Sequence, residues 1–147
     1  MPADECIFCS IVAGTNPCHE IYRDDTTLAF MDINPANEGH CLVIPKAHFR
    51  KVFAMSPKAF AAVASSVVKV ARAVNDELRP GGLSILQANG ALAGQTVPHV
   101  HVHVLPRQSD DNLLINWDRE RTHDKSSDHA RIAAIAERLR SRLLASK

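Results

Sequence analysis

Three histidines at every second position stand out in this sequence of 147 residues, which contains eight histidines in all. They are His99, His101 and His103, and a valine occupies each position between them. Successive side chains of a β-strand point to opposite faces of its sheet, so a strand here would place the imidazoles on one face and the valines on the other. Imidazole changes its charge near neutral pH and serves as a nucleophile, a proton carrier or a metal ligand. The pattern therefore predicts a chemically active strand face over residues 99–105.

The spacing of the histidines limits what a single metal ion can do on such a strand. Neighbouring histidines would lie about 6.6–6.8 Å apart and the outer two about 13 Å apart, whereas zinc–nitrogen bonds are about 2.0–2.1 Å long. One ion cannot easily bind all three side chains, but His99 and His101 together would suit the metal site of a metal-dependent hydrolase. The other possibility is a division of labour, in which one histidine binds a metal ion and the others take part in the reaction.

The segment before these histidines has the composition of a loop. Residues 88–97 include Asn89, Gly94, Gln95 and Thr96. Glycine allows a ligand to approach the backbone closely, and backbone N–H groups together with the Thr96 hydroxyl can hold a phosphate group. The segment lacks the Gly-Lys-Ser/Thr ending of a P-loop, so by itself it indicates only a hairpin loop. Beside three histidines it predicts an anion-binding loop that faces the imidazoles.

Two of the four cysteines, Cys6 and Cys9, are three positions apart. We expect a short helix over residues 4–13 with Asp4 as its N-cap, and this spacing places both thiols on one side of a helix. Because disulfides are rare in the cytoplasm, the pair is interpreted as half of a metal site, with a redox pair and two ordinary buried thiols as the alternatives. The other two cysteines are expected to be packing residues.

The hydrophobic pattern and the turn residues predict the elements that position these groups. A long helix over residues 57–78 has Ser56 as its N-cap and Pro57 at its first position, and residues 80–82 end it. Strands are expected at residues 20–23, 27–32, 40–44, 83–87 and 99–105, and a last helix at residues 127–144. Short turns between strands and few helices favour an α+β fold, an antiparallel sheet with one long and several short helices packed on it.

The overall composition excludes several classes of protein. Lysine and arginine number 17 against 16 acidic residues, a net charge of +1, whereas a nucleic-acid-binding protein usually has a strong basic excess. No apolar run is long enough to span a membrane, and the acidic first residues do not resemble a signal peptide. We therefore expect a single domain over residues 1–147 in the cytoplasm, with neither a nucleic-acid nor a membrane partner.

Residues 99–105 fit the signature His-φ-His-φ-His-φ-φ, where φ is an apolar residue, and so resemble the histidine triad (HIT) superfamily. Further segments similar to motifs of that family lie at residues 6–9, 30–35, 39–48 and 93–107. The similarity extends over about residues 5–107, and residues 108–147 would form a C-terminal extension with a helix. The resemblance implies a HIT-like fold and a homodimer, with the sheet extended or packed across the two chains.

The same resemblance implies a nucleotide hydrolase or transferase of the general bacterial type. Such an enzyme acts at the α-phosphorus of nucleoside phosphoramidates or dinucleotide polyphosphates, and here the purine nucleotide substrate would yield an AMP-type product. His101 would be the nucleophile that forms a transient nucleotidyl-histidine, and His103 would contact the transferring phosphate or the leaving group. His40 would lie beside the nucleophile, and the His99 backbone carbonyl is another candidate to orient it. No catalytic cofactor is expected.

The resemblance also implies which residues bind the nucleotide and a metal ion. Asp32 would accept hydrogen bonds from the ribose hydroxyls, and Ile33 would lie beside the base. The phosphate contacts would come from Asn89, Gly94, Gln95 and Thr96. A zinc ion would be held by Cys6, Cys9, His48 and His99. Two thiolates and two imidazoles saturate a tetrahedral zinc ion, so such a site would be structural.

Two other functions are compatible with the residues alone. One is a metal-dependent hydrolase in which His99 and His101 bind the catalytic ion. The other is a nucleotide-binding sensor with little turnover. The three histidines left without a role in any of these hypotheses, His19, His123 and His129, are expected to be ordinary surface residues.

Overall fold

The computed structural model describes residues 5–113 and 129–146. It consists of two compact units, residues 1–111 and residues 112–147, and each is described by itself. The predicted cap at Asp4, the predicted start of the last helix at Ser127 and the side chain of His123 lie outside the described residues.

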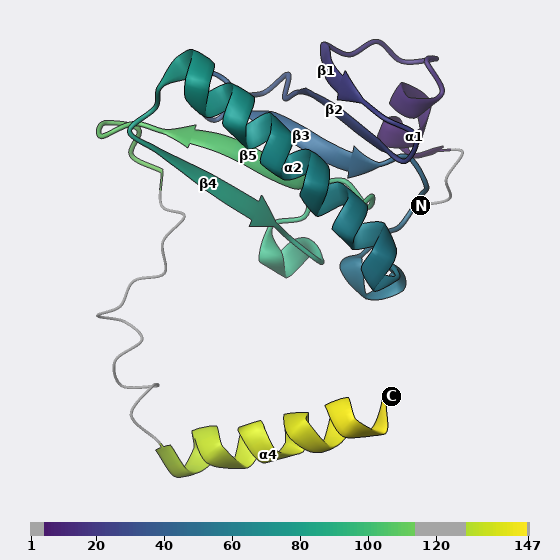
Figure 1. Ribbon diagram of the computed structural model, residues 1–147, viewed down its shortest axis with the longest axis vertical. Helices are drawn as coiled ribbons and strands as arrows, with labels where there is room; N and C mark the ends of the chain where they lie inside the picture. The colour runs from purple at the N-terminus through teal and green to yellow at the C-terminus, as the bar shows by residue number, and fades with distance from the viewer. Residues whose placement is uncertain (1–4, 114–128, 147) are drawn as a thin grey trace. The chain divides into compact units, whose positions relative to one another are not determined.

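The first unit is built around a five-stranded antiparallel sheet with the strand order β1-β2-β3-β5-β4 (Figure 1). The strands are β1 (Glu20–Arg23), β2 (Thr27–Met31), β3 (Cys41–Pro45), β4 (Gly82–Gln87) and β5 (Val102–Arg107). The strand that carries His103 lies between two others, with His103 opposite Leu42 of β3 and Leu86 of β4. The predicted α+β fold with an antiparallel sheet is confirmed.

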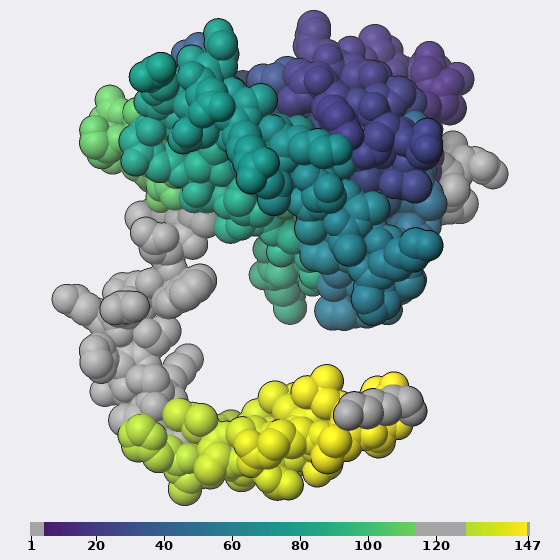
Figure 2. Space-filling view, viewed as in Figure 1, coloured from purple at the N-terminus to yellow at the C-terminus, as the bar shows by residue number. Residues whose placement is uncertain are grey.

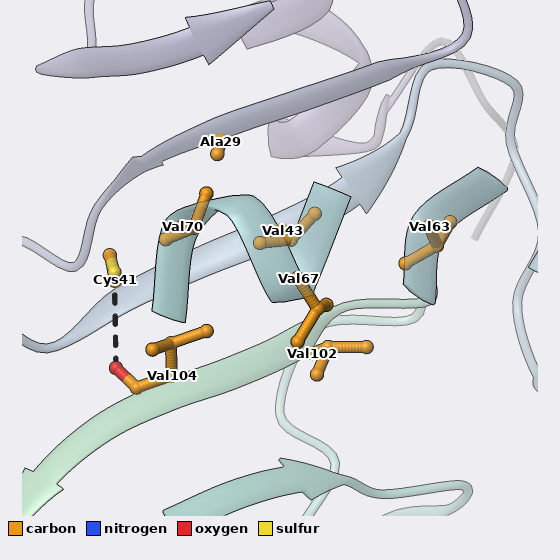
Figure 3. Packing of buried hydrophobic residues seen from close by; sticks show 8 residues of the cluster. All are labelled: Ala29, Cys41, Val43, Val63, Val67, Val70, Val102 and Val104. Atoms are coloured by element: carbon orange, nitrogen blue, oxygen red, sulfur yellow. Dashed lines mark hydrogen bonds between the residues drawn. The ribbon is translucent and has the colours of Figure 1, made fainter. Parts of the chain in front are cut away.

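The long helix α2 (Pro57–Leu78) packs across one face of this sheet (Figure 1). It begins where predicted, because the Ser56 side chain accepts a hydrogen bond of 3.1 Å from the N–H of Ala59. It ends because Arg79 adopts a left-handed conformation with φ 48° and the following proline has no N–H with which to continue the helix. Figure 3 shows the apolar core between α2 and the sheet, formed by Ala29, Cys41, Val43, Val63, Val67, Val70, Val102 and Val104.

The short helix α1 (Ile7–Val12) packs on the opposite face of the sheet. Successive residues of β2 belong to different cores, since Ala29 faces α2 whereas Leu28 and Phe30 pack with Phe8 of α1. The helix is shorter than the predicted 4–13, since it begins at Ile7 and ends at Val12. A sheet covered on both faces explains why β2 and β3 are apolar at almost every position rather than at alternate ones.

The predicted strand over residues 99–105 is correct only in its second half. β5 begins at Val102 rather than at His99. The N–H of Val100 donates a hydrogen bond of 2.7 Å to the carbonyl of Phe49, so the backbone there is bonded to a loop and not to a neighbouring strand. At its other end β5 continues through a proline to Arg107, paired with β4. The first two histidines of the triad therefore lie in an irregular segment that leads into the strand.

Packing between α2 and the β1–β2 hairpin includes a buried polar network. In Figure 2 the teal surface of α2 adjoins the purple surface of the first strands. Beneath it the Ser66 hydroxyl of α2 donates a 3.2 Å hydrogen bond to Asp24 in the hairpin turn, and the Thr27 hydroxyl lies 2.7 Å from that of Ser66. The network ties the long helix to the edge of the sheet.

The second unit contains helix α4 (His129–Ala145). Its exposed apolar side chains are spaced as on one side of a helix, and they include Ile132, Ile135, Leu139 and Leu143. An ion pair of 2.7 Å joins Arg140 to Glu137 one turn earlier. In the part of the chain that the structure describes, no helix combines the length and the apolar composition needed to cross a membrane.

Candidate active site and metal centre

A cavity of about 400 Å³ lies on the α1 side of the sheet. Its walls come from α1, from the end of β2 with the turn that follows, and from the segment that leads into β5. Five of the residues predicted to act in the site line it: Asp32, Ile33, Thr96, His101 and His103. The cavity joins the predicted chemical groups to an apolar wall that includes Phe8 and Phe30, which is the composition expected of a small-molecule site.

The middle histidine, His101, is held in a single orientation by the backbone. Its Nδ1 atom lies 2.7 Å from the carbonyl oxygen of His99. A carbonyl only accepts hydrogen bonds, so Nδ1 carries the proton and Nε2 has a free lone pair. Burial lowers the pKa of His101, against opposing effects of the His99 carbonyl and of Asp32. A buried, neutral imidazole with a free Nε2 in a cavity is suited to nucleophilic attack.

The third histidine, His103, is paired with His40 and not with the backbone. The Nε2 atom of His40 lies 2.9 Å from Nδ1 of His103 and 3.6 Å from a carboxylate oxygen of Asp32. Burial, and then the neighbouring His101 and His40, lower the pKa of His103 to about 4. Of the two candidates to orient the nucleophile, the structure thus places the His99 carbonyl on His101, while the ring of His40 contacts His103.

The imidazoles do not form the evenly spaced, solvated row that an extended strand would give. The ring centroids of His101 and His103 are 4.9 Å apart, and the side chain of His99 is fully buried and turned toward Cys6 and Cys9. Both nitrogens of His99 have partners of their own, so they are not available to a metal ion shared with His101. This geometry disfavours the metal-dependent hydrolase that the sequence left open.

The four predicted metal ligands come together beneath α1. The His99 Nδ1 atom lies 3.5 Å from Sγ of Cys6, 3.5 Å from Sγ of Cys9 and 3.2 Å from Nδ1 of His48, and the last two of these atoms are 3.3 Å apart. Around a zinc ion with bonds of about 2.0–2.1 Å to nitrogen and about 2.3 Å to sulfur, the edges of a tetrahedron measure about 3.3–3.8 Å. The donor set and its spacing therefore fit zinc.

The other nitrogen of His99 explains how this ligand is oriented. Its Nε2 lies 2.8 Å from the carbonyl of Pro45 at the end of β3. That carbonyl accepts the Nε2 proton and leaves Nδ1 unprotonated toward the thiols, which is the arrangement typical of a metal-bound histidine. Burial lowers the pKa of His99 to about 4, against the opposing effect of this hydrogen bond.

The predicted phosphate-binding loop is only partly directed at the cavity. Thr96 lines the cavity, whereas the side chains of Asn89 and Gln95 are bonded to the protein itself. The Gln95 amide accepts from the N–H of Gly90 at 2.7 Å and donates to the carbonyl of Arg50 at 2.7 Å. These two side chains stabilise the loop. Gly94, with φ 92°, is one of its residues in the left-handed conformation. Any contact between the loop and a phosphate would come from backbone N–H groups and Thr96.

Several residues of the site were not predicted. The Phe8 ring lies edge-on at 5.3 Å from the centroid of His101 and at 5.8 Å from that of His99. Its position between the two cysteines was the available signal, since a residue there must lie where α1 meets the histidines. Asn16 and Cys18 also line the cavity, and Cys18 packs against the core on the α1 side as predicted. Nothing in the local sequence distinguishes these two from ordinary loop residues.

A comparison with protein families decides the classification. Residues 13–110 match the model of the HIT domain. The chain belongs to the HIT family. It is 40% identical to Protein hit of Bacillus subtilis, over 95% of this chain and 97% of the relative. It is also 40% identical to the adenosine 5'-monophosphoramidase hnt1 of Schizosaccharomyces pombe, over 76% of this chain and 82% of the relative.

Solved structures agree with this placement. A HIT family protein from Bacillus anthracis superimposes with a TM-score of 0.87 at 37% identity, covering 95% of this chain and 98% of the other. A zinc-bound histidine triad family protein from Mycobacterium smegmatis gives a TM-score of 0.72 at 37% identity, covering 83% of this chain and 88% of the other. The resemblance seen in the histidine motif thus extends to the whole first unit.

Proposed function

We propose that this HIT family protein hydrolyses nucleotides at the α-phosphorus and that His101 is the nucleophile. The observation that carries the proposal is the 2.7 Å bond between His101 Nδ1 and the His99 carbonyl, because it leaves the Nε2 lone pair free in a cavity. The hnt1 relative is named as an adenosine 5'-monophosphoramidase, which supports a nucleoside phosphoramidate as one substrate class. Dinucleotide polyphosphates are the other class we propose.

The reaction would proceed by two displacements at phosphorus. The Nε2 lone pair of His101 forms a bond to the α-phosphorus, and the bond to the leaving group breaks, so that the leaving group departs with the electron pair and is protonated from solvent. Water then attacks the phosphorus of the nucleotidyl-histidine and gives up a proton to solvent. The phosphorus–nitrogen bond breaks, its electron pair returns to Nε2, and neutral His101 is restored. The product is a nucleoside monophosphate. A neutral imidazole suits both steps, since it is nucleophilic near pH 7 and a good leaving group.

The rest of the cavity fits a purine nucleoside. One carboxylate oxygen of Asp32 accepts a hydrogen bond from the N–H of Asn34. The other oxygen can accept hydrogen bonds from hydroxyl groups such as those of ribose. Ile33 is 75% exposed at the cavity rim, where a planar base would cover it. The phosphate would then face Thr96 and the two histidines of β5 and its leading segment.

We further propose that Cys6, Cys9, His48 and His99 bind a structural zinc ion. The four donor atoms all lie within 4.8 Å of one another, and a zinc-bound relative of similar fold exists. A saturated tetrahedral ion supplies no reaction chemistry. It would tie α1 to the segment before β5 and so hold the His99 carbonyl against the nucleophile. A metal site with two thiolate ligands fits the reducing cytoplasm that we propose for this chain.

A homodimer is the assembly we propose. β4 is an edge strand of the sheet, and it exposes the apolar side chain of Ile85. An unpaired apolar edge is a ready surface for a second copy, and pairing there would extend the sheet across the two chains. Packing of the sheets or of α2 across the two chains is the other arrangement.

Rapid-mixing experiments with acid quench would test the reaction. With an adenosine phosphoramidate, we expect a burst of nucleotidyl-protein and release of AMP, and no burst in the His101→Asn variant. Turnover by that variant within tenfold of the parent would contradict the proposal. Tight AMP binding without any burst would instead indicate a sensor, and catalysis lost reversibly on chelation in a folded protein would indicate a metal-dependent hydrolase.

A further inference from the structure

We propose that the backbone N–H of Ala36 selects the tautomer of His40 and, through it, that of His103, so that His103 presents an Nε2–H donor to the substrate phosphate. This inference rests on the proposed function, because it concerns the same cavity. It makes Ala36 a positioning residue, since its amide acts on the substrate only through two imidazoles.

The chain of hydrogen bonds has only one consistent direction. The Ala36 N–H lies 3.1 Å from Nδ1 of His40, and a backbone N–H only donates, so this nitrogen is unprotonated. Neutral His40 must then carry its proton on Nε2, 2.9 Å from Nδ1 of His103. That nitrogen accepts, so neutral His103 keeps its own proton on Nε2. Both imidazoles are neutral near pH 7, because burial lowers the pKa of each.

In the neighbouring His101 the proton lies on the other ring nitrogen, Nδ1 instead of Nε2. A backbone carbonyl holds His101 at Nδ1, whereas a backbone amide, relayed through His40, controls His103. The first contact leaves a lone pair on Nε2, and the second leaves a proton on Nε2. With the two ring centroids 4.9 Å apart, a nucleophile and a hydrogen-bond donor lie side by side, one suited to the phosphorus and the other to a phosphate oxygen.

The same amide argues against a metal ion at this position. The donor atoms of Asp32, His40 and His103 lie within 4.8 Å of one another, close enough to share an ion. An ion on Nε2 of His40 would move the proton to Nδ1, where it would oppose the N–H of Ala36. The 3.1 Å contact between Ala36 and His40 therefore favours the chain of hydrogen bonds from Ala36 to His103 over a second metal site.

The turn that carries Ala36 is fastened to the end of β5. The side-chain amide of Asn37 donates to the carbonyl of Pro106 at 2.8 Å and to a carboxylate oxygen of Asp111 at 3.0 Å. The N–H of His40 itself donates to the Asn37 carbonyl at 3.1 Å. These contacts anchor the turn between β2 and β3, so the donor is held in place before substrate arrives.

Nitrogen NMR of zinc-loaded protein with ¹⁵N-labelled histidine tests the tautomers directly. At pH 7.5 we expect His40 and His103 as Nε2–H tautomers and His101 as the Nδ1–H tautomer. An Nδ1–H tautomer at His40 or His103 in the parent protein would overturn the proposal. So would a further equivalent of zinc that binds to His40. These spectra need no variant and no turnover, so they stay decisive even if the nucleophile assignment fails.

A matched pair of substitutions tests the amide. Ala36→Pro removes the N–H, and Ala36→Gly retains it and serves as the control. We expect Ala36→Pro to shift His40 toward the Nδ1–H tautomer and to lower kcat about 10- to 100-fold, the effect of losing one charge-assisted hydrogen bond, with a smaller change in KM. Ala36→Gly should keep the parent tautomers and kcat. Parent tautomers and full kcat in Ala36→Pro would overturn the inference, and the spectra of the parent protein decide the matter if this variant does not fold.

Discussion

The cluster of cysteines and histidines beneath α1 and the group of histidines at the cavity use the same side chain in opposite ways. In the first, both nitrogens of His99 have partners, since Nε2 meets the Pro45 carbonyl and Nδ1 meets the two thiols. In the second, His101 uses Nδ1 on a carbonyl and keeps Nε2 free in the cavity. Two residues of the same type, two positions apart, are thereby suited to metal binding and to nucleophilic attack. The difference is which nitrogen of the ring meets a backbone carbonyl, Nε2 in His99 and Nδ1 in His101.

Removal of the nucleophile should separate the two regions most sharply. In His101→Asn we expect hydrolysis of an adenosine phosphoramidate to fall by at least about a thousandfold, because none of the other described side chains that line the cavity offers a free, unprotonated imidazole nitrogen. Zinc content and the melting temperature should stay near those of the parent protein, as measured by elemental analysis and calorimetry. Loss of the metal together with activity would show that the two regions are not separable.

Removal of the metal should have the converse effect. A strong chelator, or Cys9→Ser, should lower the stability by about 3 kcal/mol or more, which corresponds to roughly 10 °C in the melting temperature of a domain of this size. At low temperature the folded protein should retain turnover within about tenfold. Cys18→Ser is the matched control, since Cys18 lies outside the cluster and should leave one zinc ion per chain. An unchanged melting temperature after zinc release would contradict a structural ion.

Asp32 tests whether the cavity holds a nucleoside in the proposed direction. Asp32→Asn should raise KM about 10- to 100-fold, because hydrogen bonds to a charged group contribute about 1.5–3 kcal/mol. The effect on kcat should be smaller, since the ribose lies away from the reacting phosphorus. Asp25→Asn, an exposed change in the β1–β2 turn, provides the control in steady-state assays. Equal effects of the two substitutions would remove Asp32 from the site.

The dependence of stability on pH follows from the neutral histidines. The pKa of His103 is lowered to about 4, below the ordinary value of about 6.5, so between these values the unfolded chain binds more protons than the folded one. The free energy of unfolding should therefore be greatest above about pH 7 and decrease as the pH falls toward 4. Denaturant titrations of zinc-loaded protein at several pH values should show that His103 takes up nearly one proton on unfolding near pH 5. The His103→Asn substitution should reduce this proton uptake. A stability that is flat from pH 7 to 4 would contradict a neutral His103.

A surface histidine sets the lower limit of these effects. His19 is exposed and belongs to neither region, so His19→Ala should change the free energy of unfolding by less than about 0.5 kcal/mol and leave zinc content and turnover unchanged. A larger loss, measured by the same denaturant titration, would show that a histidine outside both groups supports the site.

Much of the scaffold was predictable from local sequence. Ser56 followed by proline specified the start of α2, and the helix begins there with the expected cap. The apolar residues of β2 and β3 specified two buried strands. The strand prediction failed at residues 99–101. Alternation describes where side chains point but not what the backbone bonds to, and here the N–H of Val100 donates to the carbonyl of Phe49 in a loop instead of to a neighbouring strand.

By itself the sequence determined that three imidazoles alternate with valines, that two thiols share one side of a short helix, and that these features are typical of one family. Only the tertiary structure decided which group each imidazole nitrogen meets. The Cys6 thiol and the Pro45 carbonyl that meet His99 lie 93 and 54 residues away along the chain, and Ala36 reaches His103 only through His40. Whether an imidazole nitrogen carries a proton depends on such partners, and contacts across the fold, not local periodicity, supply them.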